Sequence, residues 1–202
     1  MAAPRVSESP DPSAVDHFVY LRNVTWREYE ALLAMRGERS VPRITYLCGV
    51  LELMSPSRYH ESDKKKLARL LEAWGEEKGI VLEGIGSWTL KNSKEERGAE
   101  PDECYTVGRV ARSDDDRPDI AIEVIWTSGG INKLEVYRKL GVREVWIYER
   151  ETLRFFLLRD DQYEGALRSE LLPDVDPELF TRCMREATQG DAVRAMRAAL
   201  RG

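Results

Sequence analysis

The chain has 202 residues, of which 42% are hydrophobic and 33% are charged, and its formal net charge is -5. This length fits one domain with enough chain to bury a core. The acidic balance excludes a protein that coats nucleic acid through its overall charge, although a local basic groove stays compatible with it.

Cysteine usage narrows the chemistry further. Cys48, Cys104 and Cys183 are widely spaced, and none belongs to a Cys-x-x-Cys pair. A disulfide framework and a structural zinc site are therefore not expected, and a reducing cytoplasm is the expected location. The N-terminus lacks a basic-then-apolar signal, and no apolar run approaches membrane-spanning length, which also favours a cytoplasmic protein.

The N-terminal region carries local start signals. Residues 1–16 contain three prolines and several serines, so we expect a disordered or loosely attached tail. Thr25 and Glu28 have the spacing of a capping box. They predict a first helix that runs to about Arg36 and stops at Gly37.

A hairpin and a long helix are expected next. Apolar residues over 44–54 are interrupted by Gly49, which can supply the turn conformation of a β-hairpin. A helix is expected from about Tyr59 to Lys78, with Gly79 just past its end. Its apolar stripe consists of Leu67, Leu70, Leu71 and Trp74.

The second half of the chain alternates strand and helix patterns. Strands are expected over 80–82, 88–90, 101–107, 118–126, 143–148 and 153–158, with charged loops over 91–98 and 111–117. Helices are expected over 130–140 and in patches after residue 172. This mixed order predicts an α/β (α+β) domain with one central mixed β-sheet flanked by helices. We divide the chain into the tail 1–16, a domain over 17–172 and a C-terminal helical extension over 173–202.

One carboxylate interrupts the most apolar strand. The segment after Pro118 is rich in β-branched residues and is bounded by Gly129, which is typical of a strand buried on both faces. Glu123 stands in its middle, and a charge there is costly to bury unless it is paired, hydrogen-bonded or bound to a metal. Glu123 is therefore either neutral and structural or close to a cation.

A second carboxylate precedes it by 21 residues. Asp102 opens the preceding strand, directly after Pro101. If the two strands pair, Asp102 and Glu123 converge on one edge of the sheet, and their repulsion requires a proton or a bridging cation. Mg²⁺ suits two carboxylates, a carbonyl oxygen and several waters, with Mn²⁺ as an alternative. Such an ion polarises a phosphodiester and lowers the pKa of a bound water.

Lys133 is the third candidate. It falls in the first turn of the expected helix, where a cation opposes the helix dipole. This placement indicates a nearby anion, which is either a phosphate or Glu123. Tyr137 follows one turn later on the same helical face.

These residues together resemble a known family. Asp102, Glu123 and Lys133 stand in the order of the PD-(D/E)XK nuclease superfamily, and the chain is similar to its Uma-two family of restriction-endonuclease-like proteins. The superfamily pattern places the lysine two residues after the glutamate, where this chain has Ile125, so Lys133 would reach the same point from the following helix. The segments that carry the resemblance are Tyr46–Ser57, His60–Glu61, Glu100–Tyr105, Pro118–Ile125 and Lys133–Trp146.

The resemblance implies both a fold and a chemistry. It implies a restriction-endonuclease-like fold, with Asp102 and Glu123 as Mg²⁺ ligands and Lys133 orienting the attacking water or stabilising the phosphorane. It also implies Glu61 as an accessory acidic residue at the metal. DNA is the implied partner, and a homodimer would suit the cutting of two strands.

Other side chains have simpler interpretations. Asp119 also follows a proline, but it is expected to be a loop-end residue, since about 13 Å of strand separates it from Glu123. His60 is expected to be exposed at its helix start, and Glu52 is expected to face solvent. The lysines at 64–66 either touch a DNA backbone or form a solvated helix face, which we favour.

Three functions follow from these features. The first is a Mg²⁺-dependent endonuclease that hydrolyses DNA phosphodiester bonds. The second is a catalytically inactive nucleic-acid-binding or regulatory module with the nuclease fold, which the acidic composition and the missing Glu-x-Lys motif favour. The third is a structural protein in which Glu123 only pairs with Lys133.

Overall fold

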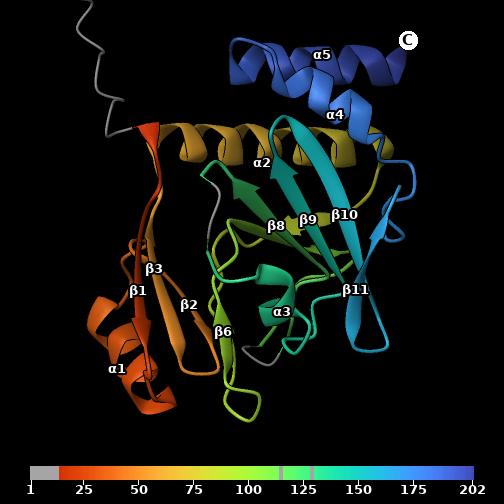
Figure 1. Ribbon diagram of the computed structural model, residues 1–202. Coiled ribbons are helices and arrows are strands. Elements are labelled where there is room, and N and C mark those ends of the chain that lie inside the picture. The colour runs from red at the N-terminus through yellow and green to blue at the C-terminus, as the bar shows by residue number, and fades with distance from the viewer. Residues whose placement is uncertain (1–13, 114–115, 128–129) are drawn as a thin grey trace, which may run out of the picture.

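Two sheets and five helices make up the described part of the protein. The computed structural model describes residues 14–113, 116–127 and 130–202 (Figure 1). The expected α/β (α+β) class and the restriction-endonuclease-like arrangement are confirmed, although the strands form two sheets where one was expected. The helices are α1 Trp26–Arg36, α2 Arg58–Lys78, α3 Lys133–Tyr137, α4 Pro177–Met184 and α5 Gln189–Arg201.

The two sheets differ in their strand directions. Sheet A is antiparallel and contains, in spatial order, β1 His17–Arg22, β3 Val50–Ser55, β2 Arg43–Leu47, β6 Arg97–Ala99 and β5 Leu90–Asn92. Sheet B contains β11 Gln162–Ala166, β10 Thr152–Arg159, β9 Glu144–Glu149, β8 Ile120–Ile125, β7 Glu103–Val107 and β4 Leu82–Gly84. Its β8–β9 pair is parallel, which requires a crossover connection, and α3 lies in that crossover.

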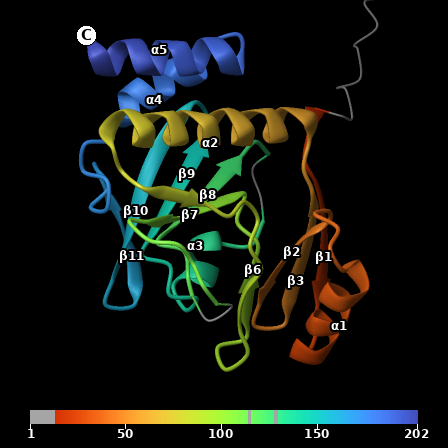
Figure 2. The same ribbon diagram turned by 180° about the vertical axis from the view of Figure 1, so that it is seen from behind.

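The helices cover the sheets from different sides. Figures 1 and 2 show α2 running across one end of the molecule, with α4 and α5 stacked beyond it and α1 beside sheet A. The apolar stripe expected on α2 is confirmed, because Leu67, Leu70, Leu71 and Trp74 are all buried. Phe180 of α4 and Met196 of α5 belong to the same core cluster, so the C-terminal helices extend this core.

Strand β8 is buried on both faces, as its sequence predicted. Ile122 packs with Trp74 in the core beneath α2, whereas Ala121 packs with Tyr137 of α3 on the opposite face. Because successive side chains alternate between faces, Glu123 lies on the same face as Ala121, towards α3. The carboxylate of Glu123 therefore lies on the face of β8 that packs against α3.

Several elements indicated by local sequence patterns are present in the structure. Thr25 and Glu28 make the full capping box of α1, in which each side chain binds the other residue's backbone N–H. The hairpin of β2 and β3 is present. So is the β9–β10 hairpin, where Arg150 and Glu151 have positive φ angles of 49° and 58°, as a tight two-residue turn requires.

The crossover helix is shorter than predicted. A helix over 130–140 was expected, but α3 begins only at Lys133, because the Asn132 side chain accepts hydrogen bonds from the N–H groups of Leu134 and Glu135. The helix ends at Tyr137, three residues before the expected end at residue 140. This capping places Lys133 at the first position of the helix, as the sequence indicated.

Three strands were missed. Strand β6 lies in the segment predicted as a charged loop, where the Arg97 guanidinium is satisfied by the carbonyl oxygens of Glu135 and Glu95 at 3.0 and 2.6 Å. Gly98 admits the Tyr29 ring, since a Cβ at this position would lie 2.0 Å from the Tyr29 hydroxyl oxygen. Strands β1 and β11 are partly exposed edge strands without a strong apolar alternation.

The predicted N-terminal tail lies mostly outside the described residues. At its end, however, Asp16 is buried, and its Oδ1 accepts a hydrogen bond of 2.8 Å from the N–H of Ser57. Strand β1 follows immediately and pairs with β3. The segment that leads into β1 is thus tied to the start of α2.

Candidate active site

A pocket of about 330 Å³ lies between the two sheets. Its walls come from β1 and β3 of sheet A, from β8, β9 and β10 of sheet B, and from the segment that leads into α3. We call it the catalytic pocket because it holds Glu123 and Lys133, two of the residues expected to be catalytic. The charged side chains that line it are Asp16, Glu52, Glu123, Lys133 and Arg154.

Glu123 reaches this pocket from the middle of β8. The residue is only 4% exposed, and its Oε1 accepts a hydrogen bond from the hydroxyl of Tyr137 on α3. Burial, reinforced by the charge of Glu123, raises the pKa of Tyr137 well above its usual value. Tyr137 therefore stays protonated and acts as a donor that orients the carboxylate.

Lys133 reaches the same pocket from the start of α3. Its ammonium donates to Thr45 Oγ1 at 2.6 Å and lies 3.4 Å from Glu52 Oε1. The structure thus corrects the hypothesis that Lys133 serves as the partner of Glu123, since its ion pair is made with Glu52 and Glu123 is bound by Tyr137. The side chain of Lys133 keeps 18% of its surface exposed.

Glu52 was predicted to face solvent, and this was wrong. The residue is 1% exposed, and its Oε2 accepts a hydrogen bond of 2.8 Å from the N–H of Ile131. Glu52 lies on β3 between its register partners Tyr20 on β1 and Thr45 on β2, and the α3 approach covers this face. Burial and the neighbouring charge of Glu52 raise the pKa of Tyr20. The alternation of apolar and polar residues in β3 indicated that the strand has two different faces, but it did not indicate that both faces are covered by other parts of the protein.

Asp102 lies just before β7 and is 1% exposed. Its Oδ2 accepts a hydrogen bond of 2.6 Å from the N–H of Val124, and its Oδ1 contacts the guanidinium of Arg43 and Nε2 of His60, the latter at 3.0 Å. Glu103 faces Ile122 in the β7–β8 register.

Continuing this antiparallel register by one residue sets Asp102 opposite Glu123 across the strand pair. The structure therefore brings the two residues to adjacent positions, and the backbone of β8 next to Glu123 binds the Asp102 carboxylate directly. Asp102 does not line the catalytic pocket, which Glu123 and Lys133 do. Among the described residues no three His, Cys, Asp or Glu side chains are grouped to hold a metal ion, so ligation by Asp102 stays a prediction.

His60 was expected to be exposed, and the structure corrects this. Its ring is completely buried at the start of α2, with Nδ1 3.2 Å from Asp16 Oδ2 and Nε2 3.0 Å from Asp102 Oδ1. A histidine bound on both ring nitrogens has a fixed orientation. Because Asp16 lies 44 residues away in sequence, no local pattern could indicate this contact.

Glu61 lies one residue further along α2 and outside the pocket. Its carboxylate pairs with Arg43 at 2.8 Å and with Lys64 at 2.7 Å, and 42% of its side chain is exposed. Burial acts to raise the pKa of Glu61, but the hydrogen bond from Lys64 and the charge of Arg43 outweigh it and lower that pKa. Arg43 therefore links two carboxyl groups, those of Glu61 and Asp102.

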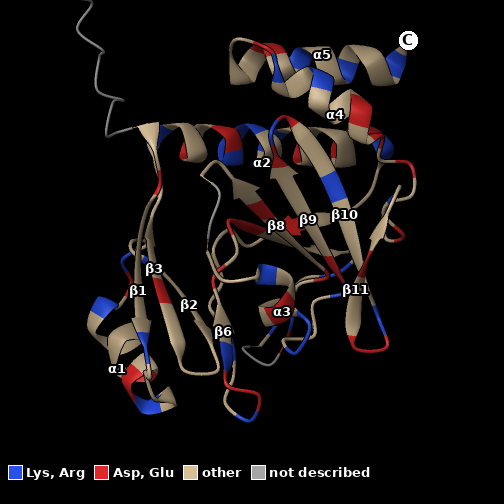
Figure 3. Cartoon of the chain, in the orientation of Figure 1, with Lys and Arg blue, Asp and Glu red and all other residues tan. Residues whose placement is uncertain are grey.

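The remaining candidates have structural roles. Asp119 accepts a hydrogen bond of 2.9 Å from the N–H of Val107 and pairs with Arg109 at 3.3 Å, which confirms its prediction as a loop-end residue. Lys66 donates to the carbonyl oxygens of Met184 and Glu186 at the end of α4. Figure 3 shows Lys and Arg interspersed with Asp and Glu along the chain, so its basic side chains are spread among acidic ones.

Comparison with known proteins agrees with this fold. The family model of the Uma2 proteins, described as "Putative restriction endonuclease", matches residues 26–184. No curated protein shows significant similarity to the chain. None of the helices in the described part combines the length and apolar character that a bilayer span requires. The matched range covers α1 through α4 and every charged residue of the pocket except Asp16, and the chain therefore belongs to the Uma2 (Uma-two) family.

Proposed function

We propose that this protein is a Mg²⁺-dependent endonuclease that hydrolyses DNA phosphodiester bonds in the reducing cytoplasm. The observation that carries the proposal is the meeting of Glu123 and Lys133 in one pocket of a restriction-endonuclease-like fold, with Asp102 across the strand pair from Glu123. The family assignment supports a nuclease in general, and the residues supply the more specific chemistry.

The donor set fits a Mg²⁺ ion. Glu123 lines the pocket with one oxygen held by Tyr137, which leaves its other oxygen for a ligand. A carboxylate offers about four acceptor positions, and the described contacts of Asp102 with Arg43, His60 and the N–H of Val124 occupy three of them. Mg²⁺ commonly takes only one or two carboxylates and completes its shell with water and phosphate oxygens. When bound, the ion would polarise the phosphate and lower the pKa of a coordinated water.

Lys133 supplies positive charge on the pocket wall. Its ammonium is held by Thr45 and Glu52, so its position does not depend on substrate. A preorganised cation stabilises the negative charge that develops on phosphate oxygens in the transition state, and it does so at no cost of reorganisation. Glu52 therefore acts as a positioning residue for Lys133.

Glu61 is assigned an accessory role. It touches Arg43, which in turn touches Asp102, so it acts on the site through the guanidinium. We expect Glu61→Gln to lower activity less than Glu123→Gln does, because the pocket keeps its own carboxylate.

DNA nicking tests the proposal. Purified protein with Mg²⁺ or Mn²⁺ should nick supercoiled plasmid, and Glu123→Gln or Asp102→Asn should lower the rate by about 100-fold or more, as removal of an electrostatic catalytic group commonly does. Asp119→Asn is the matched control, since Asp119 also follows a proline but binds Val107 and Arg109 away from the pocket. Equal nicking by wild type and both site variants would refute the proposal.

A non-cleaving nucleic-acid-binding module is the second candidate. The contacts of Asp102 favour this function, because its carboxylate binds Arg43 and His60, whereas a catalytic carboxylate would bind a metal ion. This function predicts tight DNA binding without divalent cations, binding that weakens steeply with salt as counterions are released, and no cleavage. A homodimer, which would bring two sites to the two strands of a duplex, stays a prediction.

A further inference from the structure

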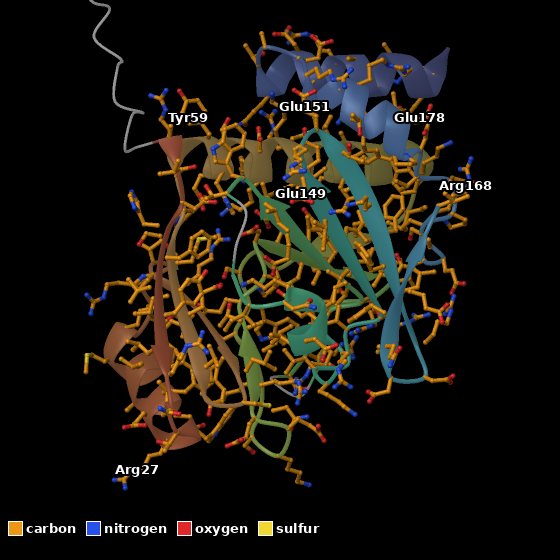
Figure 4. All side chains as sticks on the ribbon, in the orientation of Figure 1. Arg27, Tyr59, Glu149, Glu151, Arg168 and Glu178 are labelled. Carbon is orange, nitrogen blue, oxygen red and sulfur yellow. The ribbon has the colours of Figure 1, made fainter. Side chains whose placement is uncertain are left out.

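Two exposed aromatic rings stack on each other beside the catalytic pocket. Tyr59 and Trp126 are 37% and 46% exposed, and their ring centroids lie 5.5 Å apart with the planes 13° from parallel. Figure 4 shows Tyr59 at the start of α2, near the outer edge of the molecule. Single exposed apolar residues are ordinary, but a stacked pair in which both large rings stay exposed offers an organised apolar surface.

The pair is held in a fixed orientation from both sides. The Trp126 indole N–H donates to the carbonyl oxygen of Ala14 at 2.7 Å. On the Tyr59 side, the Arg58 guanidinium lies 5.0 Å from the ring centroid and donates to the Tyr59 hydroxyl at 3.3 Å. Because these contacts are already made, a planar ligand would not have to order the rings when it binds.

A second cavity lies beside Trp126 and shares wall residues with the catalytic pocket. Its volume is about 480 Å³, and the shared residues are Val124 and Ile125. We call it the Trp126 groove. Trp126 follows Glu123 by three residues, so roughly 10 Å of extended chain separates them. That is the span of a few nucleotides of a DNA strand, which rise about 3.4 Å each in a duplex.

The charges of the groove favour a base over a long phosphate track. Arg150 lines it, is exposed, and has no ion-pair partner in the described part of the chain. Arg185 also lines it but is paired with Glu151 at 3.1 Å, and Asp63 adds a second acidic wall residue. A groove of mixed charge with an aromatic wall suits a neutral planar group, with one cation free for a flanking phosphate.

We propose that Trp126, supported by Tyr59, stacks against an unpaired base of the DNA strand whose phosphate enters the catalytic pocket. A base inside a duplex already has both faces stacked on its neighbours, whereas an unpaired base offers a free face to an aromatic side chain. The substrate class is therefore DNA with a single-stranded segment, such as a splayed arm or a frayed end. This inference rests on the proposed function and names its substrate.

Binding of labelled DNA tests the stacking contact without cleavage. Fluorescence anisotropy would compare a fluorescein-labelled single strand with the same sequence as a duplex, with Ca²⁺ in place of Mg²⁺. Trp126→Leu and Trp126→Phe both lose the hydrogen bond to Ala14, but only Phe keeps an aromatic face. Leu167→Ala is the control for an unrelated exposed apolar residue, which is 92% exposed.

The expected result is specific to the aromatic face. Trp126→Leu should weaken single-strand binding by about 5- to 150-fold, the value of one base–aromatic stack, while Trp126→Phe and the Leu167 variant should weaken it far less. Equal loss in the Leu and Phe variants, or equal affinity of wild type for duplex and single strand, would overturn the inference. Melting temperatures check the fold, and Tyr59→Leu carries the same comparison if Trp126→Leu unfolds.

Cleavage assays separate this inference from the proposed function. In one outcome the wild type nicks DNA, and Trp126→Leu cuts splayed and fully paired substrates with the same ratio of rates as the wild type. That result would refute the stacking role and leave the nuclease proposal intact. In the other outcome the wild type cuts no DNA, but its binding of single-stranded DNA still depends on an aromatic residue at position 126. That result would refute the nuclease proposal and support a base-stacking role for Trp126.

Discussion

The Glu52–Lys133 pair offers a quantitative test of how the pocket is held together. Glu52 is 1% exposed and Lys133 has an 18% exposed side chain, with 3.4 Å between Oε1 and Nζ. Removing one member of a fully buried ion pair costs about 3–5 kcal/mol of the free energy of unfolding. Because Lys133 keeps some contact with water, we expect Glu52→Gln to lower the free energy of unfolding by about 1.5–3 kcal/mol, the range of hydrogen bonds to charged groups.

A double-mutant cycle isolates this interaction. Glu52→Gln, Lys133→Met and the double variant would be compared by urea unfolding. The coupling free energy should be about 1–3 kcal/mol, in the upper part of the range for side chains in contact. In a protein of this size, each kcal/mol lowers the melting temperature by about 2–4 °C.

The Lys91–Glu30 pair is the matched control for this cycle. Its atoms lie 3.0 Å apart, but both side chains are about half exposed, at 50% and 46%. Such surface pairs contribute about 1 kcal/mol or less. A coupling for Glu52 and Lys133 no larger than that of the surface pair would refute the view that Glu52 positions the lysine.

Three further predictions concern thiols, pH and metal. The disulfide-exchange reagent DTNB should react rapidly with only one thiol of the native protein, that of Cys48, because Cys48 is exposed whereas Cys104 and Cys183 are buried. Burial also raises the pKa of Cys104 to about 12, which disfavours its reactive thiolate. Rapid reaction of all three thiols would contradict this burial. Burial acts to raise the pKa of Asp16, but its hydrogen bonds with His60 and Ser57 and the charge of His60 together outweigh burial and lower that pKa. Its stabilising contribution is therefore present above about pH 4 and is lost as pH falls through the lowered pKa, so Asp16→Asn should lose less stability than wild type between pH 7 and 3 in urea unfolding. Mg²⁺ should raise the melting temperature of wild type but not of Glu123→Gln; an equal rise would place the ion elsewhere.

The sequence predicted the parts of the fold that depend on nearby residues. The capping box of Thr25 and Glu28, the apolar stripe of α2 and the doubly buried strand around Glu123 are all set by local pattern, and the structure contains each of them. Lys133 at the start of its helix belongs to the same class, because Asn132 next to it supplies the cap. Local signals thus placed two of the charged residues of the pocket correctly.

The sequence could not predict contacts that join distant elements. Glu52 alternates with apolar neighbours as a solvent-facing residue would. It is nevertheless covered by the segment that leads into α3, where its hydrogen-bond partner Ile131 lies 79 residues later in the chain. His60 is buried because Asp16 and Asp102 reach it from two other elements. Such contacts depend on how the sheets pack together, and a single sequence does not record that packing.

The central claim is that Glu123, in a buried strand, holds a divalent ion together with Asp102. A crystal grown with Mn²⁺ and measured at the manganese absorption edge would show where that ion lies. The proposal predicts an anomalous peak about 2.0–2.3 Å from a carboxylate oxygen of Glu123, within reach of Asp102. A peak away from both residues, or none at a concentration of Mn²⁺ that supports DNA cleavage, would contradict the account.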